Sequence, residues 1–286
     1  MKTDTLQNKA NLTVLRAKHL GMCFGVRDAI TLAKRVVKMR PLTVLGELVH
    51  NANVLDDLRG EGVQFETLAS DVKTETVMIT AHGASNRTKV RARESGLKLR
   101  DATCPLVHHA HKQVRQLVED GYHPVVIGRR GHVEVRGLTE DLSEHDVVLS
   151  EDDIDALSLR RRYGVVAQTT QPIARVHELV DYLKNRFPAA EVRFVDTVCQ
   201  PTKQRQSAAV ELAKRSDVVL VVGGANSNNT HELAKTCGSI VAKFIMYRGR
   251  AMFGRSGWRR RAHLVSRQAR PRRIHSSTRL NPGCMN

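Results

Sequence analysis

The segment that decides the fold is residues 104–127, CPLVHHAHKQVRQLVEDGYHPVVI. An amphipathic stretch at residues 105–121 is followed by a short apolar run at residues 124–127. Pro105 suits the first turn of a helix, because the N–H that proline lacks would have no partner there. We therefore expect a helix that leads through a turn into a buried strand, with Cys104 directly before the helix.

The same alternation continues on both sides of this segment. Further apolar, β-branched runs predict strands at residues 43–49, 76–80, 146–149, 164–167 and 217–222. Amphipathic stretches predict helices at residues 26–39, 85–96, 172–187 and 201–215. Short apolar strands that alternate with helices are typical of parallel sheets with helices on both faces. The sequence therefore predicts an α/β fold.

Two more cysteines stand directly before predicted helices. Cys23 and Cys199 lie 81 residues before and 95 residues after Cys104. A helix N-terminus carries unpaired N–H groups and a partial positive charge, which lowers a thiol pKa. We interpret the pattern as three similar α/β units that each offer one thiolate to a common centre. An anionic iron–sulfur cluster with one iron free of cysteine suits such a centre. The alternative is three unrelated buried cysteines. Cys237 lies late in a helix and is predicted to be a packing residue.

Histidines follow three of the predicted strands. His50 follows residues 43–49, His82 follows residues 76–80, and His132 lies shortly after residues 124–127. Ligands of open parallel sheets bind beyond the carboxyl ends of the strands. We expect the three histidines to neutralise a polyanion such as diphosphate there. The alternative is that each is a solvated loop residue.

Other polar residues follow the remaining strands. Thr169 comes after residues 164–167, and a Gly-Gly turn after residues 217–222 leads to a cluster of side chains suited to phosphate oxygens: Ser227, Asn228 and Asn229. Glu134 is the one acid placed among these groups, and a carboxyl group in a closed pocket is a natural proton donor. Its alternative role is a surface acid or a helix cap.

The net charge of +17 is concentrated in the last part of the chain. Residues 1–237 carry 34 basic and 29 acidic side chains, whereas residues 238–286 carry 12 basic side chains and no acidic one. The body therefore need not act on nucleic acid. Five cysteines without a CxxC pair, a polar N-terminus and apolar runs far shorter than the ~20 residues of a membrane span predict a cytoplasmic protein without a membrane association.

At this point the sequence resembles a known family, the 4-hydroxy-3-methylbut-2-enyl diphosphate reductases, also called the LytB family. Eight motifs occur in family order over residues 13–237: Gly21-Met-Cys23-Phe-Gly-Val, Leu48-Val-His50-Asn51, Ala81-His82-Gly83, Asp101-Ala-Thr-Cys104-Pro105-Leu-Val, Gly131-His132-Val-Glu134-Val, Gln168-Thr169-Thr170, Cys199, and Asn226-Ser227-Asn228-Asn229. Each motif alone is weak, and the ordered set of eight is specific.

The resemblance implies three α/β domains around one 4Fe-4S cluster held by Cys23, Cys104 and Cys199. It implies reductive removal of the hydroxyl group of an allylic diphosphate, giving isopentenyl and dimethylallyl diphosphates. Glu134, Thr169 and His132 would serve catalysis. The substrate would contact His50, His82, His132, Thr169, Ser227, Asn228 and Asn229. Electrons would come from a ferredoxin or flavodoxin.

The last part of the chain departs from the family pattern. We expect domains at residues 13–104, beginning with an N-terminal strand, and at residues 105–198. We also expect an incomplete third unit at residues 199–237 and a basic, disordered tail at residues 238–286 that a frameshift near Gly238 would explain. Two alternatives to an active reductase follow from the tail. One is an inactive truncated homologue, and the other is a nucleic-acid-binding protein that uses the basic tail.

Overall fold

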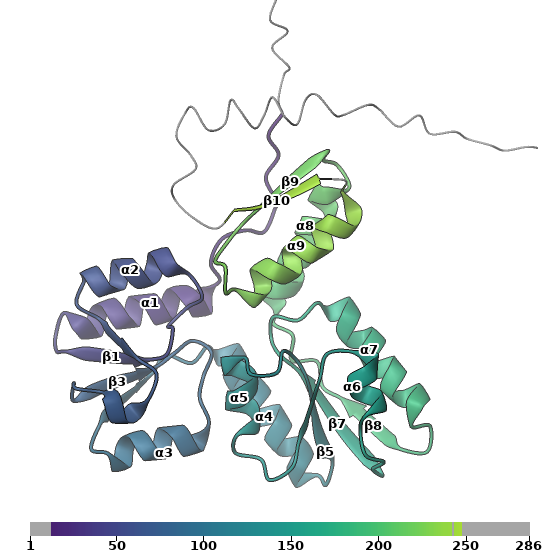
Figure 1. Ribbon diagram of the computed structural model, residues 1–286, viewed down its shortest axis with the longest axis horizontal. Helices are drawn as coiled ribbons and strands as arrows, with labels where there is room; N and C mark the ends of the chain where they lie inside the picture. The colour runs from purple at the N-terminus through teal and green to yellow at the C-terminus, as the bar shows by residue number, and fades with distance from the viewer. Residues whose placement is uncertain (1–12, 242, 248–286) are drawn as a thin grey trace, which may run out of the picture. The chain divides into compact units, whose positions relative to one another are not determined.

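The computed structural model describes residues 13–241 and 243–247. The described residues from Leu15 onward belong to one compact unit, in which the described strands form three separate parallel sheets. The first sheet has the order β2-β1-β3-β4, built from strands β1 (Leu42–Leu45), β2 (Gln64–Glu66), β3 (Thr76–Ile79) and β4 (Lys98–Asp101). Helices α1 (Phe24–Val37) and α2 (Ala52–Gly60) lie on one face of this sheet and α3 (Asn86–Glu94) lies on the other, with a 3-10 turn η1 (Ala69–Asp71) before β3 (Figure 1).

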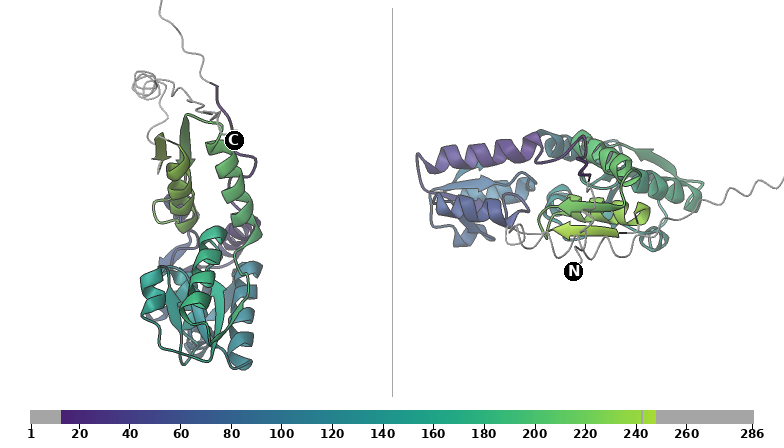
Figure 2. Two further views of the ribbon diagram at one scale, coloured as in Figure 1. Left: turned by 90° about the vertical axis from the view of Figure 1, so that its right-hand side faces the viewer. Right: turned by 90° about the horizontal axis from the view of Figure 1, so that it is seen from above.

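The second sheet repeats the strand order of the first. Its order is β6-β5-β7-β8, from β5 (His123–Ile127), β6 (Asp146–Val148), β7 (Arg162–Ala167) and β8 (Glu191–Phe194). Helices α4 (Pro105–Glu119) and α5 (Val133–Thr139) cover one face, while α6 (Glu151–Asp155) and α7 (Ile173–Arg186) cover the other. Figure 2 shows this layering from two further directions. In both sheets the first and third strands are neighbours, so the chain reverses its direction of winding between them.

The third sheet has two described strands, β9 (Val218–Val222) and β10 (Lys243–Tyr247), which pair in parallel. Helices α8 (Gln200–Ala213) and α9 (Asn228–Ile240) pack on one face, against Val219 and Val221. The other face of β9 carries Leu220 and Val222, which are 42% and 63% exposed. The helix–strand–helix–strand order of α8, β9, α9 and β10 matches the start of the other two units.

Alternating side chains of the central strands build the cores. In the second sheet, Val125 and Val165 pack toward α6 and α7, whereas Val126 and Val166 pack toward α4 and α5. Both sets are fully buried. Strands that are apolar on both faces belong in the middle of a parallel sheet covered by helices, and this explains why the apolar runs of β5 and β7 predict their position so well.

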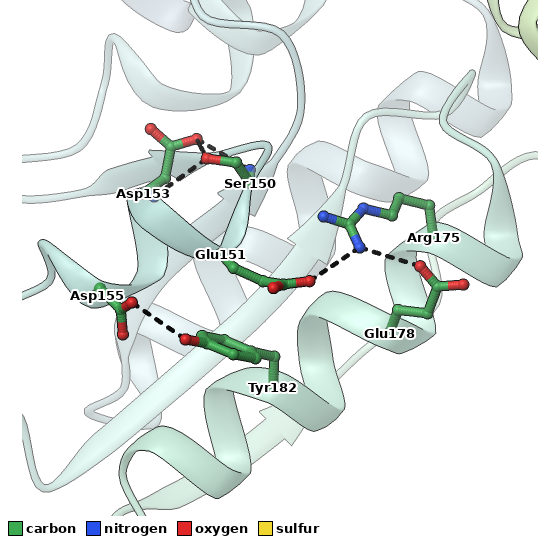
Figure 3. A network of polar contacts seen from close by, with 7 residues as sticks. All are labelled: Ser150, Glu151, Asp153, Asp155, Arg175, Glu178 and Tyr182. Carbon is green, nitrogen blue, oxygen red and sulfur yellow. Dashed lines mark hydrogen bonds and ion pairs between the residues drawn. The ribbon is translucent and has the colours of Figure 1, made fainter.

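Polar contacts hold α6 against α7 (Figure 3). Ser150 and Asp153 form a reciprocal capping box at the start of α6, which satisfies N–H groups that the short helix would leave unpaired. The guanidinium of Arg175 on α7 contacts Glu151 at 3.2 Å and Glu178 at 3.0 Å, and the Tyr182 hydroxyl donates to Asp155 at 3.1 Å. Because most of these groups are exposed, packing of Ile154 in the core contributes more to the position of α6 than the ion pairs do.

The observed elements correct the sequence prediction in several respects. The expected N-terminal strand is absent, since residues 13–23 form neither helix nor strand. The shorter helices α2, α5 and α6 are not predicted by the sequence pattern. The edge strands β2, β4 and β8 lack apolar runs because their side chains are partly exposed, so the sequence pattern misses them. The prediction that the strand–helix alternation ends at Gly238 is wrong, since α9 continues to Ile240 and β10 follows. Residues 248–286, the rest of the predicted tail, lie outside the described residues. The division into three domains stays a prediction. No described helix is long and apolar enough to cross a membrane.

The start of α1 lies directly against the start of α4. A Cβ atom added to Gly25 would collide with the side chain of Cys104, so only glycine fits there. We predict that Gly25→Ala lowers the free energy of unfolding by about 1–3 kcal/mol, because the methyl group must displace the Cys104 side chain or the helix. Urea denaturation followed by circular dichroism measures the change.

Gly60 on α2 is the matched control, because an added Cβ there meets no atom within 4 Å. Gly60→Ala is expected to leave stability unchanged or to raise it by up to about 1 kcal/mol through its better helix propensity. Equal effects of the two substitutions would contradict the close approach of α1 to Cys104.

Candidate functional site

Each of the cysteines Cys23, Cys104 and Cys199 is the N-cap residue of a helix. They precede α1, α4 and α8 respectively, and these are the helices that enter the first strand of each sheet. None of the three side chains caps its own helix, and each is a half-buried free thiol. The Sγ of Cys199 contacts Thr202 Oγ1 at 3.0 Å. The repeated position leaves all three sulfur atoms available to a ligand.

The three thiols face a common region. Cys23 interacts electrostatically with both Cys104 and Cys199, and Glu134 interacts with the same two cysteines. The close approach of Gly25 fixes Cys104 beside the start of α1. Within the described residues, no three His, Cys, Asp or Glu side chains gather closely enough to hold a single metal ion.

The expectation that the helix N-termini lower the thiol pKa is wrong for two of the cysteines. Burial raises the pKa of Cys104 and of Cys199, and the neighbouring Cys23 and Glu134 raise it further. Backbone N–H groups at the helix starts act in the opposite direction, as the sequence predicts, but burial has the larger effect. The thiols of Cys104 and Cys199 are therefore held neutral in the free protein, and a nearby cation such as iron would favour their deprotonation.

The predicted histidines come together in one cluster. His50 and His82 follow the adjacent strands β1 and β3, and their rings stack with centroids 4.3 Å apart. His132 follows β5 and meets both rings edge-on, at 5.3 Å and 5.6 Å. The Nε2 atoms of His50 and His82 are buried without a hydrogen-bond partner among the described residues. Unsatisfied polar atoms of this kind are costly, so their grouping marks a place for a polar ligand.

The charge expected on the histidines is not present on His82 and His132 in the free protein. Burial lowers the pKa of His82 well below its usual value, with further lowering by His50 and His132. Burial, together with His50 and Arg129, lowers the pKa of His132 to about 4. The neutral ring of His132 accepts a hydrogen bond from the Glu134 N–H at Nδ1, 3.1 Å away, which leaves its Nε2–H as a donor. His82 and His132 therefore meet an incoming anion as neutral hydrogen-bond donors, and they gain charge only if the anion brings a proton with it.

Glu134 is buried at the start of α5, with 1% of its surface exposed. Its carboxyl group accepts a hydrogen bond from the Thr169 N–H at 2.6 Å and another from the Thr169 hydroxyl at 3.0 Å. Burial raises the pKa of Glu134 to about 7, and the two hydrogen bonds from Thr169 only partly oppose this. A carboxyl group with such a pKa holds a proton near neutral pH and can release it. The alternative of a surface acid is excluded.

The third group of predicted residues lies at the start of α9, after β9. Ser227 is the N-cap residue and accepts from the Thr230 N–H, while Asn228 donates to the Thr170 hydroxyl at 3.0 Å. The Oδ1 atom of Asn229 is buried without a partner among the described residues. The Asn228–Thr170 contact connects this turn to the strand end that carries Thr169. Cys237 is fully buried in the core of the third sheet, which confirms its predicted packing role.

Two residues that support the site have roles that sequence reasoning does not predict: Gln168, which belongs to a motif but has no predicted role, and Thr197. Gln168 accepts from the Arg129 N–H at 3.0 Å and donates to Thr170, so it ties the ends of β5 and β7 together. Thr197 binds both the N–H and the carbonyl of Ala167 with its hydroxyl. Neither role has a local pattern, because the partners lie about 30 or 40 residues away. For Gly25, the sequence feature that could indicate its role is the neighbouring Cys23.

Comparisons with known proteins give one consistent result. A family model described as LytB protein matches residues 14–249. The 4-hydroxy-3-methylbut-2-enyl diphosphate reductase of Symbiobacterium thermophilum is 35% identical over 245 residues, which cover 81% of this chain and 82% of the relative. The enzyme of the same name from Neisseria meningitidis is 36% identical, over 79% of this chain and 73% of its own length.

Solved structures agree with the sequence matches. The E-1-hydroxy-2-methyl-but-2-enyl-4-diphosphate reductase of Plasmodium falciparum has a TM-score of 0.75 and 30% identity, over 79% of this chain and 73% of that one. A structure of (E)-4-hydroxy-3-methyl-but-2-enyl diphosphate reductase, described as the terminal enzyme of the non-mevalonate pathway, has a TM-score of 0.63 and 33% identity, over 85% and 88% of the two chains. The family motifs recognised in the sequence end at residue 237, whereas the family model matches the chain as far as residue 249. The chain, with its cysteine-capped helices and buried Glu134–Thr169 pair, belongs to the LytB family of 4-hydroxy-3-methylbut-2-enyl diphosphate reductases.

Proposed function

We propose that this chain reduces (E)-4-hydroxy-3-methylbut-2-enyl diphosphate to isopentenyl and dimethylallyl diphosphates in the cytoplasm. The observation that carries the proposal is the set of three helices that each begin directly after a cysteine, together with a buried Glu134 whose pKa is raised to about 7 and a cluster of histidines with unpartnered ring nitrogens. The reaction breaks one C–O bond, forms one C–H bond and consumes two electrons and two protons, and the hydroxyl group leaves as water. A truncated, inactive homologue is not favoured, because the family match extends to residue 249.

Cys23, Cys104 and Cys199 would hold a 4Fe-4S cluster. Three thiols that are not used in capping, each at a helix start, are a donor set that suits an anionic cluster. When bound, the cluster would pass electrons from the donor to the substrate and offer an iron to the substrate hydroxyl group. The partial positive charges of three helix N-termini would stabilise its negative charge, and this offsets part of the cost of burying it.

Glu134 would provide the proton that turns the departing hydroxyl group into water. Its raised pKa keeps the proton in place near pH 7, and the hydroxyl group of Thr169 fixes the orientation of the carboxyl group. Thr169 would also contact the substrate hydroxyl. His132, which is two residues before Glu134 and accepts its N–H, would position the helix start that carries Glu134 and face the substrate.

The diphosphate group would bind among His50, His82, His132, Ser227, Asn228 and Asn229. Neutral imidazole N–H groups and asparagine side chains donate hydrogen bonds to phosphate oxygens, and the N-terminus of α9 favours an anion. The unpartnered Nε2 atoms of His50 and His82 support this assignment, because a bound phosphate would satisfy them. A ferredoxin or flavodoxin would supply the electrons.

The proposed cluster makes a direct prediction for Cys104→Ser. The protein prepared under anaerobic conditions should be brown, contain about four iron atoms per chain and convert the allylic diphosphate with a chemical reductant. Cys104→Ser should lose most of its iron and visible absorbance, since one of three ligands is gone. Cys237→Ala is the control and should keep both, because Cys237 lies in the core of the third sheet. A variant that stays fully brown without Cys104 would refute the ligand assignment, and an iron-loaded chain without turnover would refute the function.

The raised pKa of Glu134 predicts a pH-dependent stability. Below about pH 4.5 the carboxyl group is protonated in both the folded and the unfolded chain, so its ionisation does not affect the free energy of unfolding. As the pH rises from about 4.5 to about 7, only the unfolded chain ionises, so roughly 3 kcal/mol of stability is lost. Glu134→Gln should remove this part of the pH dependence in urea denaturation, whereas Glu119→Gln on the exposed side of α4 should not. If the free energy of unfolding changed with pH in the same way in the wild type and in Glu134→Gln, the pKa of Glu134 would not be raised.

The histidine cluster predicts how the chain binds inorganic diphosphate. His82→Phe keeps an aromatic ring in the stack but removes the buried Nε2 donor. We expect the dissociation constant for diphosphate to rise by roughly tenfold or more at pH 7, as measured by isothermal titration calorimetry, because a hydrogen bond to a charged ligand is lost. His109→Phe, at an exposed position on α4, should bind as the wild type does. Unchanged binding by His82→Phe would place the diphosphate elsewhere.

A further inference from the structure

An exposed apolar surface surrounds Cys23. Leu20, Met22 and Phe24 are 66%, 47% and 39% exposed, although they flank a half-buried thiol on both sides. Single exposed apolar residues are ordinary, but three within five positions beside a proposed cluster ligand are an unusual concentration of exposed apolar surface. We call Leu20, Met22 and Phe24, together with Lys18, Arg27 and Arg205, the Cys23 patch.

Positive charge borders this apolar centre. Lys18 and Arg27 are exposed, and neither forms an ion pair with any described residue. Arg205 on α8 donates to the Gly21 carbonyl from Nε at 3.2 Å and from Nη2 at 3.0 Å, which keeps its charge beside Cys23 without neutralising it. Lys18 also lines a groove with Gln200 and Lys203, next to Cys199. The contacts of Arg205 with Gly21 thus connect helix α8 to the segment before α1 and hold this basic side chain at the edge of the patch.

Few acids offset these charges. Lys203 is paired with Asp196 at 2.5 Å. Glu211 lines the same groove as Lys18, and Asp28 is exposed on α1. An apolar centre with a polar rim is the usual anatomy of a protein–protein interface, and a rim in which basic side chains outnumber acidic ones favours an acidic partner. Exposed aliphatic side chains would contribute little to binding a phosphate backbone, so a protein partner fits better than nucleic acid.

The position of the patch beside Cys23 indicates that its partner is an electron donor. Among the three proposed ligands, Cys23 is the one flanked by exposed apolar residues, so a protein docked there would stand next to the cluster. The proposed reaction consumes two electrons per substrate. A carrier that delivers one electron at a time would dock, transfer its electron and leave twice per turnover, and such an exchange favours a small, weakly held and electrostatically steered interface.

We propose that the Cys23 patch is the docking surface for an acidic one-electron carrier protein. This inference rests on the proposed function. Two reduced carriers each lose one electron here, and the two electrons with two protons convert the allylic alcohol into the alkene and water. Met22 and Phe24 form the contact centre, while Lys18, Arg27 and Arg205 steer the acidic partner.

The test compares the double variant Lys18→Glu/Arg27→Glu with Arg93→Glu, an exposed residue on α3 far along the chain from the patch. All variants keep the full chain, so the basic residues after 248 contribute equally to each. Binding of an oxidised plant-type [2Fe-2S] ferredoxin is measured anaerobically by calorimetry at low and at high salt. Turnover is measured with the reduced ferredoxin and, separately, with dithionite as a small reductant. Binding of a DNA duplex and of phosphatidylserine vesicles is measured in parallel.

We expect the double variant to bind ferredoxin about tenfold more weakly and to lose most of its salt dependence, while Arg93→Glu changes neither. Turnover with dithionite should stay at the wild-type rate in both, and turnover with ferredoxin should fall only in the double variant. Equal ferredoxin binding by all three proteins would overturn the proposal. So would a larger loss of DNA or vesicle binding than of ferredoxin binding. Absence of turnover with dithionite in the wild type would contradict the proposed function instead, and the binding measurement would still decide the docking surface.

Discussion

The structure depends on a single repeated constraint, which is a cysteine at the N-terminus of the helix that enters each sheet. Cys23, Cys104 and Cys199 occupy this position before α1, α4 and α8. Because the two larger sheets share the order second–first–third–fourth strand, the loops after their first and third strands lie at equivalent places. The loops carry His50, His82, His132 and Thr169. Repetition of one simple unit thus brings chemically different side chains to one region.

Burial rather than charge sets the chemistry of this region. It keeps Glu134 protonated near pH 7 and holds His82 and His132 neutral in the free protein. It also keeps Cys104 and Cys199 as thiols until a cation compensates their charge. Burying these polar groups costs free energy. Packing of the cores behind the site, where strands such as β5 and β7 are apolar on both faces, offsets that cost. A site of neutral groups that ionise only with their ligands fits a reaction that begins with two negatively charged components, a diphosphate and an iron–sulfur cluster.

The sequence predicts the central strands and the amphipathic helices because each has a strong local signal. Pro105 and Pro201 mark helix starts, and runs such as residues 124–127 and 164–167 can only be buried strands. The edge strands β2, β4 and β8 escape prediction, since half-exposed strands pair through their backbone and need no apolar run. Site residues next to strand ends are predictable for the same topological reason. The direction of the thiol pKa shift is not, because it depends on burial by residues far away in the chain.

The proposed function requires that Cys23, Cys104 and Cys199 hold one cluster between three helix starts. The most direct measurement is a crystal structure of the full chain, reconstituted with iron and sulfide under anaerobic conditions. We expect one 4Fe-4S cluster bound by the Sγ atoms of these three cysteines, with Glu134 and the three histidines on the side of the remaining iron. A cluster bound by Cys237, or one that uses only two of the three cysteines, would contradict this expectation.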